Sequence, residues 1–157
     1  MLRKPLDLEK LKTLIENDTE CKAAFLRGFF DSEGCVSKFG AVIVYNTDLI
    51  LVEYVKQLLS SLGIETTGPR LYLKSGTAFR DLRTRKTYKS KKDAYELYVT
   101  ADSLQTFYRL IGFTVRRKQQ RLVDYLVRTG RLKPPANPPP HLSPTMLSYL
   151  DHHTIII

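Results

Sequence analysis

The order of apolar and polar residues predicts two helices at the start of the chain. In residues 6–16 the leucines and the isoleucine recur at helical spacing, which predicts a short leading helix. Asp18 or Thr19 can cap a second helix over residues 20–31, because both residue types are favoured at helix N-termini. Over residues 35–45 the pattern changes to alternation and β-branched side chains, which predicts a β-hairpin.

The clearest helix lies in the middle of the chain. Asn46, Thr47 and Asp48 are all plausible N-caps for it. The apolar residues between positions 51 and 62 form one stripe at helical spacing, and Gly63 follows as a typical helix end. An amphipathic helix is therefore expected here, with its stripe facing a core.

The second half of the chain repeats the strand and helix pattern. Strands are expected near residues 70–74 and 95–100, with a long basic stretch between them that either extends the strand pair or forms a mobile loop. Two helices follow, over residues 103–111 and 115–128. The order αα, ββ, α, ββ, αα predicts an α+β fold, with an antiparallel sheet that carries its helices on one face.

A change in composition divides the chain at about residue 132. Residues 1–132 are expected to form a single domain, since domains commonly hold roughly 100 to 200 residues. Six of the eight prolines fall between Pro134 and Pro144, and proline fixes its backbone while donating no hydrogen bond. Residues 133–157 are therefore predicted to be an extended C-terminal arm, which carries apolar residues able to dock on this chain or on a neighbour.

The composition argues for a folded, soluble, intracellular protein. Of the 157 residues, 43% are hydrophobic, which suffices for a core. No apolar run approaches the roughly 18 residues of a membrane span, and charges interrupt the N-terminal segment where a signal peptide would be apolar. Cys21 and Cys35 fit neither a zinc pattern nor a disulfide framework, so buried free thiols are expected.

The charge is concentrated in two segments. The whole chain carries a formal charge of +9. In residues 70–92 nine basic residues and one acid give +8, and in residues 109–133 eight basic residues and one acid give +7. A basic excess confined to two segments of an otherwise acidic chain indicates a surface for a polyanion, most commonly nucleic acid. A solvated basic face is the alternative interpretation.

The chemistry is expected near the end of the second helix. Ala24, Gly28 and Ser32 recur every four residues and leave one helix face with almost no side-chain volume, so that another helix backbone can approach closely. The helix ends with Asp31 and Glu33, although the helix dipole disfavours carboxylates at that end. This arrangement suggests cation binding, and a core helix followed by a turn remains the alternative.

Residues 26–34 resemble the nine-residue motif of the LAGLIDADG homing endonucleases, with matches that include Gly28, Asp31, Glu33 and Gly34. The order of elements over about residues 20–128 is also similar to the αββαββα order of that family. The resemblance implies a saddle-shaped sheet of four antiparallel strands that lies in the DNA major groove, with two motif helices packed together at the centre. It implies a site-specific, metal-dependent endonuclease for double-stranded DNA, typically encoded in an intron.

The resemblance also implies residue roles. Glu33 corresponds to the acid that coordinates divalent metal, Mg²⁺, where most members carry aspartate, and Asp31 corresponds to a structural residue of the helix junction. A basic residue near the start of the last helix stabilises the transition-state phosphate in the family, and Lys118 and Arg116 are the candidates, followed by Arg117. Asn46 or Thr47 corresponds to a polar residue that positions water. Phosphate contact for the three cations and helix capping for the two polar residues are the alternatives.

Residues of the sheet are expected to contact DNA, although the sequence leaves the strand register open. Major-groove readout favours long basic and polar side chains at alternating strand positions. The candidate DNA-binding residues are Lys38, Tyr45, Arg70, Tyr72, Lys74, Arg80, Arg83, Arg85, Lys86, Lys89 and Arg117.

The count of motifs predicts a homodimer. The family builds its active centre from two motif helices, and this chain has one. A second copy would then pair through Ala24, Gly28, Asp31 and Ser32, and twofold symmetry would require a partly palindromic target. The main rival is a non-cleaving protein on the same scaffold, either an RNA maturase or a DNA-binding regulator. A structural RNA-binding protein would explain the charge but not the acid-ended helix.

Overall fold

A computed structural model describes residues 7–134, so most of the predicted C-terminal arm, from residue 135 onward, lies outside the described residues. The centre of the fold is one antiparallel sheet of four strands in the order β1-β2-β6-β3. Its strands are β1 (Gly34–Val36), β2 (Val42–Asn46), β3 (Thr66–Leu73) and β6 (Ala94–Val99). The predicted α+β class and the four-stranded antiparallel sheet are confirmed.

Two helices lead into the sheet. Helix α1 spans Leu8–Ile15 and helix α2 spans Thr19–Glu33. Asp18 is the N-cap of α2, because its side chain accepts a hydrogen bond from the backbone N–H of Cys21 at 2.7 Å. Helix α2 runs without a break into β1, so Glu33 is the last helical residue before the sheet begins.

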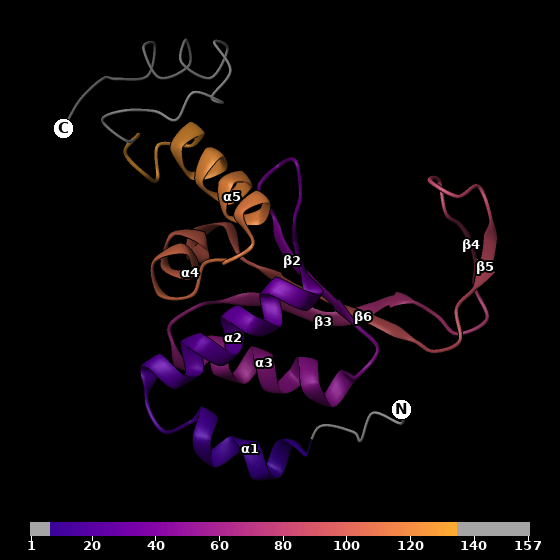
Figure 1. The fold of residues 1–157 in the computed structure, drawn as a ribbon, viewed down its shortest axis with the longest axis horizontal. Coiled ribbons are helices and arrows are strands. Elements are labelled where there is room, and N and C mark those ends of the chain that lie inside the picture. The colour runs from indigo at the N-terminus through magenta and orange to yellow at the C-terminus, as the bar shows by residue number, and fades with distance from the viewer. Residues whose placement is uncertain (1–6, 135–157) are drawn as a thin grey trace.

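Helix α3 (Leu49–Ser61) connects the two halves of the sheet. Of the three predicted N-cap candidates, Asp48 takes the position, and its side chain accepts from the N–H of Leu51 at 3.1 Å. The Asn46 side chain instead accepts from the N–H of Asp48 at 2.8 Å, which shapes the turn before the helix. Figure 1 shows α2 and α3 together on one side of the sheet.

The chain ends in two more helices. A single 3₁₀ turn, η1 (Ala101–Ser103), precedes α4 (Leu104–Leu110), and α5 spans Arg116–Arg128 and packs against β1. The helix predicted from residue 103 is thus preceded by a 3₁₀ turn, and Ser103 makes no side-chain capping hydrogen bond to α4.

The predicted basic stretch between β3 and β6 extends the strand pair. It forms a separate two-stranded antiparallel ribbon of β4 (Ala78–Arg80) and β5 (Thr87–Lys89). Figure 1 shows this ribbon projecting away from the body of the domain. Its turn is ordered by the Asp81 carboxylate, which accepts from the backbone N–H groups of Arg83 and Thr84 and from the Thr84 hydroxyl.

The two faces of the four-stranded sheet differ. Val36, Val42, Val44, Leu97 and Val99 point into the core with the helices, where the aromatic rings of Phe30 and Phe107 also meet. The intervening residues of each strand point to the opposite, open face, because side chains alternate along a strand. The strand register therefore places Cys35, Ile43, Tyr45, Arg70, Glu96 and Tyr98 on that open face.

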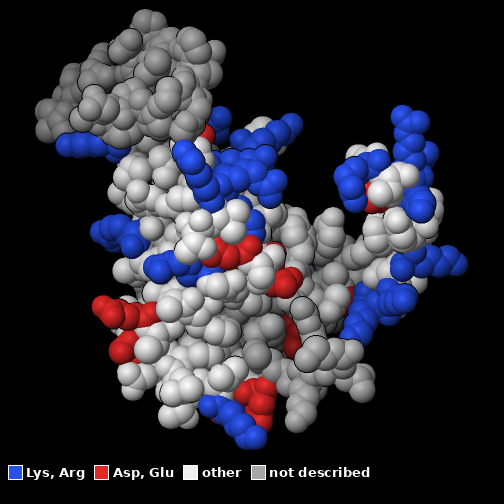
Figure 2. Space-filling model, in the orientation of Figure 1, with Lys and Arg blue, Asp and Glu red and all other residues white. Residues whose placement is uncertain are grey.

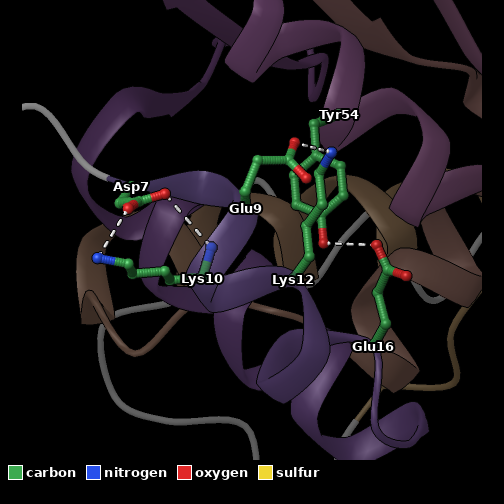
Figure 3. Close-up of polar contacts among 6 residues, drawn as sticks. All are labelled: Asp7, Glu9, Lys10, Lys12, Glu16 and Tyr54. Atoms are coloured by element: carbon green, nitrogen blue, oxygen red, sulfur yellow. Dashed lines mark hydrogen bonds and ion pairs between the residues drawn. The ribbon is translucent and has the colours of Figure 1, made fainter.

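Polar contacts fasten α1 to α3. The Tyr54 hydroxyl on α3 donates to the carboxylate of Glu16 at 2.9 Å (Figure 3). Lys12 of α1 lies over the Tyr54 ring at 5.4 Å from the centroid, and it pairs with Glu9 of the same helix. Burial, followed by the hydrogen bond to Glu16, raises the pKa of Tyr54 above its usual range.

The two cysteines differ in burial from the prediction. Cys21 and Cys35 are free thiols as expected, but both are only half-buried. They differ from the expected buried thiols because Cys21 follows the exposed N-terminus of α2 and Cys35 faces the open side of the sheet. Among residues 7–134, no helix is both long enough and apolar enough to cross a membrane.

Candidate active site and nucleic-acid interface

The candidate active site lies where the end of α2 meets the start of α5. The Asp31 carboxylate accepts hydrogen bonds from the backbone N–H of Thr114 at 3.0 Å, from the Thr114 hydroxyl, and from the N–H of Val115 at 3.3 Å. Val115 is the N-cap of α5, and these N–H groups would otherwise lack a partner at a helix start. Asp31 therefore joins α2 to α5, and its negative charge also suits the positive end of the α5 dipole.

Lys118 of α5 reaches back to the end of α2. Its ammonium nitrogen donates to the carbonyl oxygens of Phe30 at 3.1 Å and Asp31 at 2.6 Å. These are carbonyls of the last turn of α2, where a cation is favourable and where the sequence of the helix itself supplies none. The positive charge of Lys118 thus offsets the unfavourable negative charges of Asp31 and Glu33 at the end of the helix. Its ammonium group contacts the backbone of Asp31, two residues before Glu33.

Glu33 is free to bind a ligand. Its side chain is exposed, and it makes no hydrogen bond or ion pair with any other residue of the described part of the chain. Asp31, two residues earlier, has its carboxylate occupied by Thr114 and Val115. The two acids of the motif therefore differ in availability, and only Glu33 presents an open carboxylate to solvent.

The other candidates for catalysis occupy different positions around this centre. Arg116 and Arg117 are exposed in the first turn of α5, one and two residues before Lys118. Gly34 lies opposite Val44 in the first hairpin, so the end of β2, with Asn46 and then Thr47, lies at the same end of the hairpin as the end of α2. The side-chain carbonyl oxygen of Asn46 already accepts a hydrogen bond from the Asp48 N–H.

The small-residue face of α2 is open. Ala24, Gly28 and Ser32 are exposed, and a Cβ added at Gly28 would meet no atom of the described residues within 4 Å beyond the surrounding turn of α2 itself. The opposite face of the helix carries Ala23, Leu26, Phe29 and Phe30, which are buried in the core. Close approach of a second helix backbone is therefore sterically possible at Gly28.

The predicted DNA-binding residues divide into three groups. Tyr45, Arg70 and Tyr72 belong to the four-stranded sheet, where the rings of Tyr45 and Tyr72 are 4.7 Å apart. The ribbon and its approaches carry a second group, namely Lys74, Arg80, Arg83, Arg85, Lys86 and Lys89. Lys38, in the turn of the first hairpin, and Arg117, at the start of α5, form the third group.

The positive charge lies at two sides of the open sheet face. Figure 2 shows Lys and Arg gathered over α5 and along the β4–β5 ribbon. A pocket of about 140 Å³ between the first hairpin and α5 is lined by Ser37, Lys38, Arg121, Asp124, Tyr125 and Arg128. Because cations flank the sheet on two sides, the arrangement can hold a long polyanion across the open face.

Sequence reasoning missed Glu96 and Tyr98, which are central to the open face. Glu96 pairs with Arg70, with 2.8 Å between Nε and Oε1, and Tyr98 lies beneath the same guanidinium. Burial, followed by hydrogen bonding to Tyr98, raises the pKa of Tyr45 on the adjoining strand. The alternation of residues 94–99 was available in the sequence, but pairing Glu96 with Arg70 required the register.

Metal binding has few protein ligands available. Within residues 7–134, no cluster of three or more His, Cys, Asp and Glu side chains is placed to hold a metal ion. The exposed Glu33 carboxylate fits Mg²⁺ as one ligand, since Mg²⁺ is commonly bound by one or two carboxylates together with water and substrate phosphate oxygens.

A comparison with models of protein families identifies the family of the chain. The model of the LAGLIDADG-like domain family matches residues 20–112, which is more than half of the chain. The chain therefore belongs to the LAGLIDADG-like domain family, and the family predicted from residues 26–34 is confirmed.

Individual relatives cover different parts of the chain. The uncharacterized protein MJ0398 of Methanocaldococcus jannaschii is 37% identical over 103 residues, which are 65% of this chain and 36% of that protein. The chain thus matches only about a third of the length of this relative.

Two solved structures are similar to the chain. One is a variant of I-DmoI in complex with its target DNA in the presence of 2 mM Mg, with a TM-score of 0.44 and 21% identity over 66% of this chain and 48% of that chain. The other is I-DmoI in complex with DNA and Ca, with a TM-score of 0.38 and 19% identity over 92% of this chain and 56% of that chain.

Proposed function

We propose that this protein is a site-specific, metal-dependent endonuclease for double-stranded DNA. The observation that carries the proposal is Glu33, an exposed and unpaired carboxylate at the end of a helix whose last carbonyls are held by Lys118. A solvent-facing carboxylate beside a basic surface has no evident structural role, and it can share a cation with a bound phosphate.

Glu33 would hold the divalent metal, and the phosphates of DNA would complete its ligand set. When bound, Mg²⁺ supplies charge stabilisation of the phosphorus centre and lowers the pKa of an attacking water. Glutamate instead of the more common aspartate places its carboxylate one methylene farther from the helix.

The cations around Glu33 have separable roles. Lys118 spends two of its three N–H donors on the carbonyls of Phe30 and Asp31, so it fixes the end of α2 and keeps one donor for a phosphate. Arg116 and Arg117 are exposed at the helix start and can contact the phosphate directly. Arg116→Met is therefore expected to lower cleavage without loss of stability, whereas Lys118→Met lowers both.

A second copy of the chain would complete the active centre. One Glu33 carboxylate would hold the metal for cleavage of one strand, so cleavage of both strands requires two such carboxylates. Pairing through Ala24, Gly28 and Ser32 would bring both copies of α2 together, and Asp31 at the end of the same helix would lie at the edge of that contact. Twofold symmetry then gives a target with two related half-sites. A DNA target implies an intracellular location, and for an intron-encoded enzyme the cleavage site would be the uninterrupted junction into which the intron inserts.

The DNA would lie across the open face of the sheet. Sheet residues would enter the major groove, while the β4–β5 ribbon and the α5 side would hold the phosphates. The sheet itself contributes little charge, since its guanidinium at Arg70 is paired with Glu96, so affinity and base readout come from different parts of the surface.

The test is Glu33→Gln, which removes the charge but keeps the size of the side chain. Cleavage of the target in Mg²⁺ should fall by at least about 100-fold, while the gel-shift affinity for DNA stays within about twofold. Glu53→Gln is the matched control, because it removes another exposed carboxylate, from α3, and should leave cleavage unchanged. Unchanged cleavage by Glu33→Gln would refute the assignment. Specific binding without cleavage by the parent protein would instead favour the non-cleaving alternatives, a DNA-binding regulator or, if RNA is bound, a maturase.

A further inference from the structure

The shape of β3 decides where Arg70 points. Thr67 lies opposite Tyr98, and Arg70 lies opposite Glu96, so β3 advances by three residues where β6 advances by two. This extra residue is a β-bulge at Gly68 and Pro69. Without it, alternation would turn Arg70 to the face opposite that of Thr67; with it, both share the open face.

The chemistry of the bulge explains why it forms there. Proline has no N–H for a sheet ladder and is therefore confined to edges and bulges. Gly68 has φ +108, a conformation that favours glycine, and the Lys56 ammonium group donates to its carbonyl oxygen at 2.6 Å. The placement of Arg70 on the open face is thus built into the backbone.

The guanidinium of Arg70 is held from two sides. Its Nε donates to Glu96 Oε1 at 2.8 Å, and its Cζ lies 5.2 Å from the centroid of the Tyr98 ring. Glu96 is itself fixed, because its side chain is only 12% exposed and accepts a hydrogen bond from the Tyr98 hydroxyl at 3.3 Å. Arg70 therefore loses less freedom on binding than an unattached arginine would.

The outer part of the guanidinium is left for a ligand. Only Nε is used, and within residues 7–134 the two terminal nitrogens of Arg70 have no hydrogen-bond partner. The side chain is 57% exposed on the open face. Two parallel N–H donors in a fixed plane match the O6 and N7 acceptors of guanine in the major groove.

The position of Glu96 also argues for readout. An acid on a face that binds a polyanion weakens the general attraction, and an ion pair with an exposed partner contributes little to stability. If the Glu96 carboxylate fixes the direction of the Arg70 guanidinium, its gain in base recognition compensates for the weaker general attraction to DNA.

We infer that Arg70 recognises a guanine in each half-site of the target and that Glu96 is its positioning residue. The inference rests on the proposed function, in which the open face of the sheet lies in the DNA major groove. It adds the identity of one base and a specificity role for an acid in the centre of the sheet.

The first experiment uses the full chain and the duplex that the parent protein selects from a random-sequence DNA library. Single guanines of this duplex are replaced by 7-deazaguanine, which lacks the N7 acceptor. One replacement in each half-site should weaken binding of the parent by about 5-fold to 20-fold. The affinity of the Arg70→Gln variant should be the same for the replaced and the unmodified duplex. Arg70→Lys, which keeps the charge but loses the planar fork, should retain overall affinity and lose the preference for guanine.

The second experiment tests Glu96 through base preference. Glu96→Ala should raise affinity for non-specific DNA and lower the preference for guanine at that position by about 10-fold, with Glu96→Gln intermediate. Glu53→Gln, which removes an acid from α3, should leave the preference unchanged. Thermal melting of each variant establishes that it is folded.

The outcomes separate this inference from the proposed function. If the parent binds no DNA duplex sequence-specifically, the proposed function fails. If the parent is specific but Arg70→Gln weakens all sequences equally, Arg70 is a phosphate contact and the inference is wrong. If Arg70 selects guanine and both Glu96 variants retain that selection, the positioning role is wrong.

Discussion

The contact between Asp31 and Thr114 should be a measurable link between α2 and α5. Three donors converge on the Asp31 carboxylate, namely two backbone N–H groups and the Thr114 hydroxyl. A hydrogen bond to a charged group contributes about 1.5–3 kcal/mol when well placed, but Asp31 is half-buried and can be partly replaced by water. We therefore expect Asp31→Ala to lower the free energy of unfolding by about 2 kcal/mol.

The magnitude can be divided between backbone and side chain. Thr114→Val keeps the branched shape and the N–H but removes the hydroxyl, and it should cost about 1 kcal/mol. Asp31→Ala and Thr114→Val both remove the hydrogen bond between the Thr114 hydroxyl and Asp31. In the double variant this hydrogen bond is lost only once, so the coupling energy should be about 1 kcal/mol. Asp31→Ala should also lower the melting temperature by roughly 5–10 °C, given the usual enthalpy of a domain of this size.

The assay is urea unfolding of the four proteins of the cycle, followed by circular dichroism at one fixed protein concentration, because dimerisation would shift the apparent stability. Thr129→Val is the matched control, since its hydroxyl donates to Tyr125 at the other end of α5 and should be additive with Asp31→Ala. A coupling energy between Asp31 and Thr114 below about 0.3 kcal/mol would refute the junction. Cleavage by Asp31→Ala should fall as well, because the helix end that carries Glu33 loses its attachment.

Three further outcomes are expected. Gly28→Leu should fold but remain monomeric in sedimentation experiments, since apart from the surrounding turn of α2 no atom of residues 7–134 lies within 4 Å of an added Cβ; a fully dimeric, active variant would contradict the helix pairing. Removing the ribbon cations Arg83, Arg85 and Lys86 should reduce the slope of log binding constant against log salt by up to about three, and an unchanged slope would exclude them from phosphate contact. Stability should fall as pH rises above about 10, because the raised pKa of Tyr54 lets the unfolded chain lose its proton first; Tyr54→Phe should show a smaller loss, and equal losses would rule out this origin.

Local patterns determined the elements of this protein. Helix α3 and its neighbours follow from apolar spacing and from the N-cap side chains of Asp18 and Asp48, which act within three residues of their partners. The family was also readable from the sequence, since the motif of residues 26–34 is contiguous. Interactions of this kind depend on short sequence separations, and the sequence alone therefore predicts them.

Tertiary structure decided the site. Lys118 was one of three adjacent basic candidates, and only the packing of α5 against the sheet brings its ammonium group to the carbonyls of Phe30 and Asp31. The role of Arg70 depends on the bulge in β3, because the extra residue between Thr67 and Arg70 decides the face of the sheet on which Arg70 lies. Its partner Glu96 is 26 residues away. Contacts across such distances depend on strand register and helix packing, which the order of residues in one element does not specify.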